Sequence, residues 1–253
     1  MKRLIYILLF LPLLANAQIG RYPFYVAPVI SVPAGEYTAM GYPSALDTNT
    51  EAWYRGDTLV TYDGDDSISA VDDLSGNSPD IVQATGAAQP KFTESGILFD
   101  GSNDYMTMAN ADLDQPLSIY LVIKQESWVL NGCIMDGQAQ NSCKLYQHTS
   151  TPGLGVYVTN TSGNNTNAPI GQFVVVTIKS NTTLNSFQIN DTEAVTWEGS
   201  TNMNALSLGR KPAGTPYYSN FRLKELIIRL GTDDAGTTSA IKTYLKARNN
   251  VTY

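Results

Sequence analysis

The stretch ILFDGSNDYMTM, residues 97–108, decides the fold of this chain. Residues 97–99 are apolar and favour a strand, and residues 100–103 supply the polar side chains of a tight turn. Gly101 can adopt positive φ in that turn without a steric penalty. Because residues 105–108 resume an apolar pattern, the stretch predicts two strands joined as a hairpin.

Short strands of the same kind recur along most of the chain. Turn signals separate a dozen or so of them at short intervals, which predicts two stacked antiparallel sheets, an all-β jelly-roll sandwich. The patterns at 118–124 and 173–178 are apolar on both faces, so we expect these strands, with 226–230, in the middle of the core. The predicted strands are residues 58–62, 81–84, 96–99, 105–109, 118–124, 133–136, 144–147, 155–158, 173–179, 186–189, 194–197, 206–208 and 223–229.

Three other features complete the domain. Trp53 precedes the first strand and is expected in the core. Residues 160–169 are polar and rich in asparagine and glycine, which predicts a loop, either a mobile tip or a binding loop. Residues 233–249 begin with an aspartate N-cap, Asp233 or Asp234, followed by apolar residues at helical spacing. This pattern predicts one short amphipathic helix that closes the domain.

The turn sequence also carries a resemblance. The phrase FDG at 99–101, followed by DY at 104–105, resembles laminin G-like and concanavalin A-like lectin and glucanase domains. The resemblance implies a concanavalin A-like sandwich over residues 51–253. Because lectins, adhesive modules and enzymes share that scaffold, it does not imply one activity. Two flanking segments support it: DLSGN at 73–77 with QP at 89–90, and YSNFRLKELII at 218–228.

Composition and charge limit the class of partner. With 253 residues, 43% of them apolar and 15% charged, the chain can bury a core, and no internal repeat divides it. Its formal net charge is −7 and no basic stripe appears. Binding to nucleic acid depends on neutralising phosphates with lysine and arginine, so we expect no nucleic-acid partner.

The first seventeen residues have the pattern of a secretory signal peptide. Lys2 and Arg3 form the basic end, residues 4–14 the apolar run, and Ala15-Asn16-Ala17 a small-residue cleavage site. We expect cleavage after Ala17 and a secreted, extracytoplasmic mature chain. The apolar run is shorter than the roughly 20 residues that span a bilayer, so no membrane span is expected in the mature chain. The alternative is a retained N-terminal anchor.

Residues 18–50 form a distinct segment. Four prolines and three glycines interrupt any regular strand, and five aromatic residues make it unlike a plain flexible linker. We expect an extended arm that either packs on its own domain or attaches the chain to a protein partner or a neighbouring subunit. The predicted organisation is therefore a signal peptide (1–17), an arm (18–50) and a sandwich domain (51–253).

The cysteines bear on a possible disulfide, and the acidic residues on a possible calcium site. Cys133 and Cys143 are the two cysteines, and in an exported protein such a pair predicts a disulfide; the alternative is two buried thiols. The acidic run that begins at Asp63 has Leu74 where a helix-loop-helix calcium site needs glutamate, so we read it as a solvated turn. In the resembled family a calcium ion often braces the sandwich, and the resemblance implies one here without assigning its ligands.

Catalytic groups are scarce. Glucanases of the resembled superfamily use two glutamates on one strand, whereas Glu225 stands alone on its predicted strand. Glu193 and Glu198 are five residues apart, so a regular strand would put them on opposite faces. His148 is the sole histidine, and no nucleophile or phosphate-loop motif accompanies it. We therefore expect no catalytic residues, and carboxylates that lie at the surface or a sheet edge.

Binding is the function that remains. Sugars are held by aromatic faces and by amide or carboxylate groups, so aromatic residues near asparagines are the candidates. The leading hypothesis is an exported, non-catalytic lectin-like module that binds glycan or a cell-surface polysaccharide. The alternatives are a structural subunit of a surface or phage assembly docked through residues 18–50, and a polysaccharide hydrolase or lyase with an unrecognised site. The candidate ligand-binding residues, each of which could instead be core, are Trp128, Asn131, Trp197, Tyr217, Tyr218 and Asn220.

Overall fold

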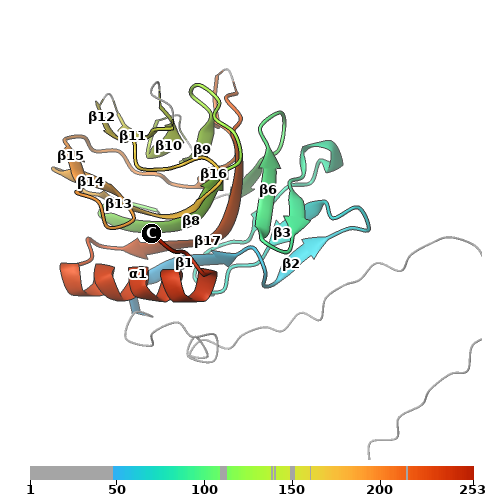
Figure 1. Ribbon diagram of the computed structural model, residues 1–253, viewed down its shortest axis with the longest axis horizontal. Coiled ribbons are helices and arrows are strands. Elements are labelled where there is room, and N and C mark those ends of the chain that lie inside the picture. The colour runs from blue at the N-terminus through green and yellow to red at the C-terminus, as the bar shows by residue number, and fades with distance from the viewer. Residues whose placement is uncertain are drawn as a thin grey trace, which may run out of the picture.

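The computed structural model of the chain describes residues 48–108, 113–137, 139, 141–148, 152–159, 161–214 and 216–253. The signal peptide and nearly all of the arm at 18–50 lie outside the described residues. The described strands form two stacked antiparallel sheets, and one helix, α1 (Ala235–Asn249), follows them (Figure 1). The predicted all-β sandwich with a short C-terminal helix is therefore confirmed.

Each sheet mixes strands from distant parts of the sequence. In spatial order the eight-stranded sheet holds β15 (Val195–Trp197), β14 (Asn185–Ile189), β13 (Phe173–Ser180), β8 (Leu117–Gln125), β17 (Asn220–Leu230), β6 (Gly96–Asp100) and β5 (Lys91–Thr93), with β1 (Thr50–Arg55) also paired to β17. The nine-stranded sheet holds β12 (Thr161–Asn165), β11 (Leu154–Val158), β10 (Lys144–Gln147), β9 (Cys133–Asp136), β16 (Leu206–Leu208), β7 (Met106–Met108), β4 (Ile81–Val82), β3 (Ile68–Val71) and β2 (Val60–Tyr62).

The main core lies between the two sheets. The strands β13, β8 and β17 are neighbours at its centre, as their apolar patterns predict, and eight of the nine residues of β8 are buried. Full burial of each large apolar side chain contributes roughly 1.5–3 kcal/mol. The sandwich therefore depends on these three strands.

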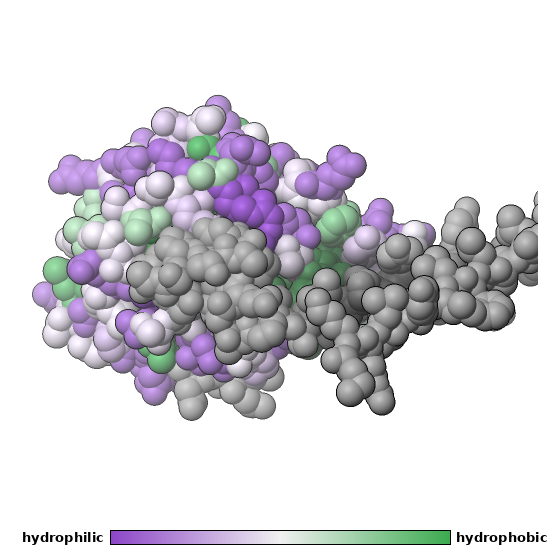
Figure 2. Space-filling model, turned by 90° about the horizontal axis from the view of Figure 1, so that it is seen from below, coloured by the Kyte–Doolittle hydropathy of each residue, from purple (hydrophilic) through white to green (hydrophobic). Residues whose placement is uncertain are grey.

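A second, smaller core joins α1 to the outer face of the eight-stranded sheet. Trp53, Tyr120 and Ile227 project from the strands and meet Ile241 and Leu245 of the helix. Figure 1 shows α1 lying along this sheet, on the side away from β9 to β12. Seen from below, the surface outside the grey residues is mostly hydrophilic with small apolar patches (Figure 2). The amphipathic helix is confirmed, with Asp234 as its N-cap.

The turn at 100–104 is a connection between sheets. The hairpin predicted from it is wrong, because β6 pairs with β17 and β5 while β7 pairs with β16 and β4 in the other sheet. Asp100 Oδ1 accepts the N–H groups of Ser102 and Asn103, and Asp104 Oδ2 accepts the N–H of Asp100 at 2.9 Å. Gly101 has φ 78° and lies against Asn220, where a Cβ would come within 2.9 Å. The polar residues therefore hold an arch between the layers.

Several local predictions also need correction. The part of the predicted loop at 161–165 forms strand β12, because its backbone pairs with β11 and Gly163 and Asn165 are buried. The sequence did not predict β1, β3 and β5. Strands β3 and β5 are short, and β1 contains Trp53, which we placed before the first strand. Strand β1 is the first strand of the described chain, and it pairs with β17, the last one.

The predicted disulfide between Cys133 and Cys143 is not formed. Both are buried free thiols, which was the alternative. The register sets Cys133 opposite Tyr146, on the outer face, whereas Cys143 belongs to the core between the sheets together with Leu145. Their side chains point to opposite faces of one sheet, and a disulfide needs facing Cβ atoms.

Glu225 was expected at a surface or sheet edge, and this is also wrong. It is 1% exposed beneath α1. Its Oε1 accepts hydrogen bonds from Trp53 Nε1 and Tyr244 Oη, both at 2.8 Å, and its Oε2 accepts one from Asn249 Nδ2 at 2.7 Å. Burial raises the pKa of this carboxyl, while the three donors oppose that rise. Glu225 therefore ties β1, β17 and α1 together.

We predict that Glu225→Ala destabilises the domain by about 3 kcal/mol or more, because it leaves three buried donors unsatisfied. Urea unfolding measures this loss. The exposed Glu193 provides the control, and Glu193→Ala should change stability by no more than about 0.5 kcal/mol. Equal, small effects of both substitutions would contradict the role of Glu225.

The arch predicts a pH effect. Burial raises the pKa of Asp104 from 3.8 to about 6. The folded protein then binds this proton more tightly than the unfolded chain, so the contribution to stability falls as pH rises from about 4 to about 6, by roughly 2–3 kcal/mol. We predict that Asp104→Asn gains stability relative to the wild type between about pH 4 and pH 7 in urea unfolding. Parallel pH profiles for the two proteins would refute this.

Candidate functional site

Two buried glutamines join the sheets at one end of the sandwich. Gln125 is the last residue of β8 in one sheet and Gln147 the last residue of β10 in the other. Gln147 Nε2 donates to Gln125 Oε1 at 2.8 Å, and the two side chains are 0% and 2% exposed. Buried amides need partners, so this pair fixes which groups lie around it.

Gln125 holds two loops in place. Its Nε2 donates to Ala168 O at 2.7 Å and to Pro152 O at 2.9 Å. Its backbone carbonyl accepts the N–H of Gly171 at 2.8 Å. The loop before β13 and the loop before β11 are therefore both attached to the end of β8.

Gln147 holds two further loops in place. Its Nε2 donates to Ser127 O at 2.6 Å, and its Oε1 accepts Val129 N–H and Ser219 Oγ–H, each at 3.0 Å. A Cβ at Gly132 would lie 2.6 Å from Gln147 Oε1, so the loop after β8 passes here with a residue that has no side chain. This loop, 126–132, and the loop at 209–219 meet over Gln147.

Five of the six predicted ligand residues come together on these loops. Trp128 is half-buried between two residues held by Gln147. Asn131 has φ 63° and donates its N–H to Gln147 O at 3.0 Å. Tyr217 is 38% exposed and its carbonyl accepts Cys133 N–H at 3.1 Å. Tyr218 follows on the same loop. Asn220 is the first residue of β17, and its carbonyl accepts Glu126 N–H at 3.0 Å.

Trp197 does not belong to this cluster. It is 8% exposed and lies in the core between the sheets, at their β15 and β12 edges. A Cβ at Gly163 would come within 2.5 Å of its ring, so a glycine on β12 makes the space for the indole. Trp197 therefore packs in the core, apart from the other predicted ligand residues.

The loop end exposes an unusual share of apolar side chain. Val129, Leu130 and Ile170 are 37%, 50% and 41% exposed, and Tyr217 adds an aromatic face. Asn131 directly follows Leu130 in the chain, and Asn167 lies in the same loop as Ile170. This surface, defined here as the loop-end surface, can hold a ligand that has both apolar faces and hydroxyl groups. Its residues are Trp128, Val129, Leu130, Asn131, Asn167, Ile170, Tyr217, Tyr218 and Asn220.

Sequence reasoning missed the glutamine pair, Leu130 and Ile170. Gln125 and Gln147 each end a strand whose other inward positions are apolar, and this was the available signal. No sequence signal marks Leu130 and Ile170, because their positions follow no strand or helix period.

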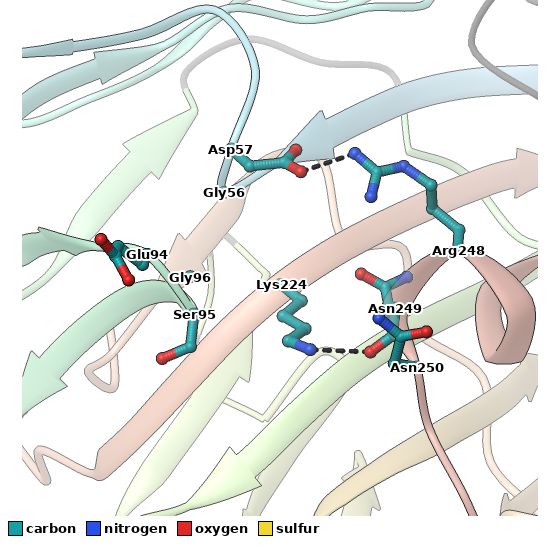
Figure 3. A pocket seen from close by; sticks show the side chains of 9 residues that line it. All are labelled: Gly56, Asp57, Glu94, Ser95, Gly96, Lys224, Arg248, Asn249 and Asn250. Atoms are coloured by element: carbon teal, nitrogen blue, oxygen red, sulfur yellow. Dashed lines mark hydrogen bonds and ion pairs between the residues drawn. The ribbon is translucent and has the colours of Figure 1, made fainter.

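Two hollows lie elsewhere. One, of about 160 Å³, is bounded by the end of α1 and the turns at 56–57 and 94–96 (Figure 3). The basic side chains that line it already have partners. Arg248 pairs with Asp57 at 2.5 Å, and Lys224 donates to Asn249 O at 2.7 Å. The other, of about 430 Å³, lies beside α1. There Lys242 pairs with Asp191 at 2.6 Å. Neither hollow contains a predicted ligand residue.

Catalytic and metal-binding candidates do not assemble. Glu193 and Glu198 are exposed, and Glu225 is enclosed by the donors described above. Within the described ranges, no group of three or more His, Cys, Asp or Glu side chains could hold a metal ion. The implied calcium ion remains a prediction. In the same ranges no helix is long and apolar enough to cross a bilayer.

Sequence comparison gives no family. A scan of family models found no match, and a search of curated proteins found none either. Comparison of structures is informative about the fold alone, because every solved structure cited below is at most 14% identical to this chain.

Three solved structures share the sandwich. Trypanosoma rangeli sialidase in complex with sialic acid aligns with a TM-score of 0.57 at 8% identity, over 81% of this chain and 34% of the sialidase. The botulinum neurotoxin serotype D binding domain aligns at 0.57 with 11% identity, over 79% and 52%. A GH54 α-L-arabinofuranosidase aligns at 0.53 with 14% identity, over 72% and 51%. The chain thus spans a third to a half of these proteins.

We predict that Gln147→Leu costs about 3 kcal/mol of stability, because it leaves several buried polar groups unpaired. Urea unfolding measures the loss, and hydrogen exchange should show faster exchange at the amide of Val129. Gln172 is exposed in a neighbouring loop, so Gln172→Leu is the control. Unchanged protection of Val129 in the Gln147 variant would show that the glutamine does not hold the loop.

Proposed function

We propose that this chain is an exported, non-catalytic module with a concanavalin A-like sandwich, and that it binds glycans through the loop-end surface. The single observation that carries the proposal is the convergence of Trp128, Tyr217 and three asparagines on loops fixed by Gln125 and Gln147. Convergence of distant segments on a buried polar anchor is typical of a preorganised binding surface.

The chemistry of the surface suits a saccharide. Sugar rings present CH faces that stack on aromatic side chains, and hydroxyl groups that hydrogen-bond to amides. The indole N–H of Trp128 is shielded from solvent and has no hydrogen-bond partner among the described residues. The amide side chains of Asn131 and Asn220 supply further donors and acceptors.

The compared proteins support this proposal without deciding it. Two of them were solved with a sialic acid, the sialidase with sialic acid and the neurotoxin binding domain with N-acetylneuraminic acid. The sandwich is therefore a fold on which sugar recognition occurs in other proteins. The sialidase and the arabinofuranosidase also keep hydrolysis open as an alternative.

The positions of the acidic side chains favour glycan binding over glycan hydrolysis. A glycosidase needs two accessible carboxyl groups that flank one bond. Glu225 is sealed under α1, and the residues of the loop-end surface include no aspartate or glutamate. A surface with aromatic and amide groups and no acid pair suits retention of a glycan rather than its cleavage.

We predict that Trp128→Ala and Tyr217→Ala each lower the affinity for a captured glycan about tenfold or more, since each removes a stacking face. A glycan array at about millimolar calcium selects the ligand, and calorimetry measures the affinity. Tyr62 is equally exposed, at 38%, on β2 at the far edge of the nine-stranded sheet, so Tyr62→Ala is the matched control. If no glycan binds, or if all three variants behave alike, the proposal fails.

A further inference from the structure

The outer face of the nine-stranded sheet carries a basic and aromatic cluster beside the loop-end surface. On β10, Lys144 and Tyr146 flank the core residue Leu145, so both point away from the core. Tyr157 stands opposite Lys144 on β11. The ammonium of Lys144 lies 4.3 Å from the ring centre of Tyr146 and 5.3 Å from that of Tyr157. A cation is thus held between two aromatic rings.

A glycine makes the floor of this cluster. Gly155 faces Tyr146 across the strands, and a Cβ there would come within 2.9 Å of the tyrosine ring. The ring therefore lies against the backbone of β11, and its hydroxyl reaches the side chain of Ser162 on β12. The ring of His148 meets it edge-on at 5.7 Å. The aromatic floor extends across β10 and β11.

A second cation connects the cluster to the loop-end surface. The ammonium of Lys211 lies 5.1 Å from the ring centre of Tyr217. Burial lowers the pKa of Lys144 and the carboxylate of Asp136 opposes that shift, while the charge of Lys211 adds to it, so the two ammonium groups are close enough to repel. Burial also raises the pKa of Cys133, on which both lysine charges act, well above its usual value. At neutral pH Cys133 is a neutral thiol and does not compensate the lysines.

No carboxylate of the described residues forms an ion pair with Lys144 or Lys211, whereas Lys124, Lys242 and Lys246 each have such a partner. Asp136 is the neighbouring acid, but it is fully buried and its oxygens accept four backbone N–H groups. In a chain of net charge −7, two such lysines side by side form a local site for an anion.

We infer that the glycan is anionic, and that its carboxylate or sulfate group binds between Lys144 and Lys211 while a sugar ring rests on Tyr157 or Tyr217. This inference rests on the proposed glycan binding and adds the chemical class of the ligand. Lysine is a compact point charge that suits either anion, and the aromatic rings next to it suit the pyranose face.

Calorimetry with three probes of similar length tests it: an oligogalacturonide, which is carboxylated; a carrageenan oligosaccharide, which is sulfated; and neutral cellotetraose. We expect at least one anionic probe to bind about tenfold more tightly than cellotetraose. Lys144→Met and Lys211→Met should each remove about tenfold of that affinity, the effect of one lost charged contact. The anionic probe should also weaken between about 50 mM and about 500 mM salt. The comparison of the two anionic probes identifies the anion.

Lys246→Met is the matched control, because it removes a lysine from α1 on the other side of the domain. The thermal midpoint of each variant shows that it is folded. Equal affinity for neutral and anionic probes, or equal losses in the Lys144 and Lys246 variants, would overturn the anionic class and leave glycan binding standing. Absence of binding to any glycan on the array would instead overturn the proposed function, and this inference with it.

Discussion

A hydrogen bond between two buried amides, from Gln147 to Gln125, is the interaction on which the functional end of this sandwich depends. The two sheets pack through apolar side chains, which fill space but do not orient loops. An amide in the same position must satisfy its donors and acceptors. The other hydrogen bonds of the two amides reach four loops, so a single buried contact sets the positions of four segments that are far apart in sequence.

On the outer face of the eight-stranded sheet, a buried charged group likewise positions the elements around it. The buried carboxylate of Glu225 on β17 accepts hydrogen bonds from an indole of β1 and from a phenol and an amide of α1. Nearby, Arg229 and Asp233 form a buried pair at 2.9 Å, and Tyr120 donates to Asp233 at 2.8 Å. These contacts specify where α1 lies, because breaking one leaves a buried polar group unpaired. The helix is therefore positioned by polar contacts and stabilised by apolar ones.

The sequence predicted the layers better than the connections. Strands with period two and strands apolar on both faces identified β8, β13 and β17, because burial alone determines that pattern. The stretch at 97–108 looked like a hairpin, since a tight turn between apolar strands is the same sequence signal whether its strands pair or separate. Pairing of β6 with β17 depends on residues more than a hundred positions away, and no local pattern records that.

The candidate site was predictable in part for a related reason. Aromatic and asparagine residues on polar loops drew attention to Trp128, Asn131 and Tyr217, and the fold brought them together. Trp197 has the same composition around it but faces Gly163 in the core, a contact that only the pairing of β11 with β12 creates. The glutamine pair joins strands of the two sheets, and Lys144 and Lys211 are far apart in the sequence, so no local pattern predicts either arrangement.

An NMR titration of the isotope-labelled domain with its captured glycan tests the central claim most directly, because it reports every backbone amide at once. Binding at the loop end predicts saturable shifts at Val129, Asn131, Tyr218 and Gly171, with little change along α1 or in β2 and β3. Shifts concentrated around α1 or the hollow at Asp57, with the loop-end amides unmoved, would contradict it.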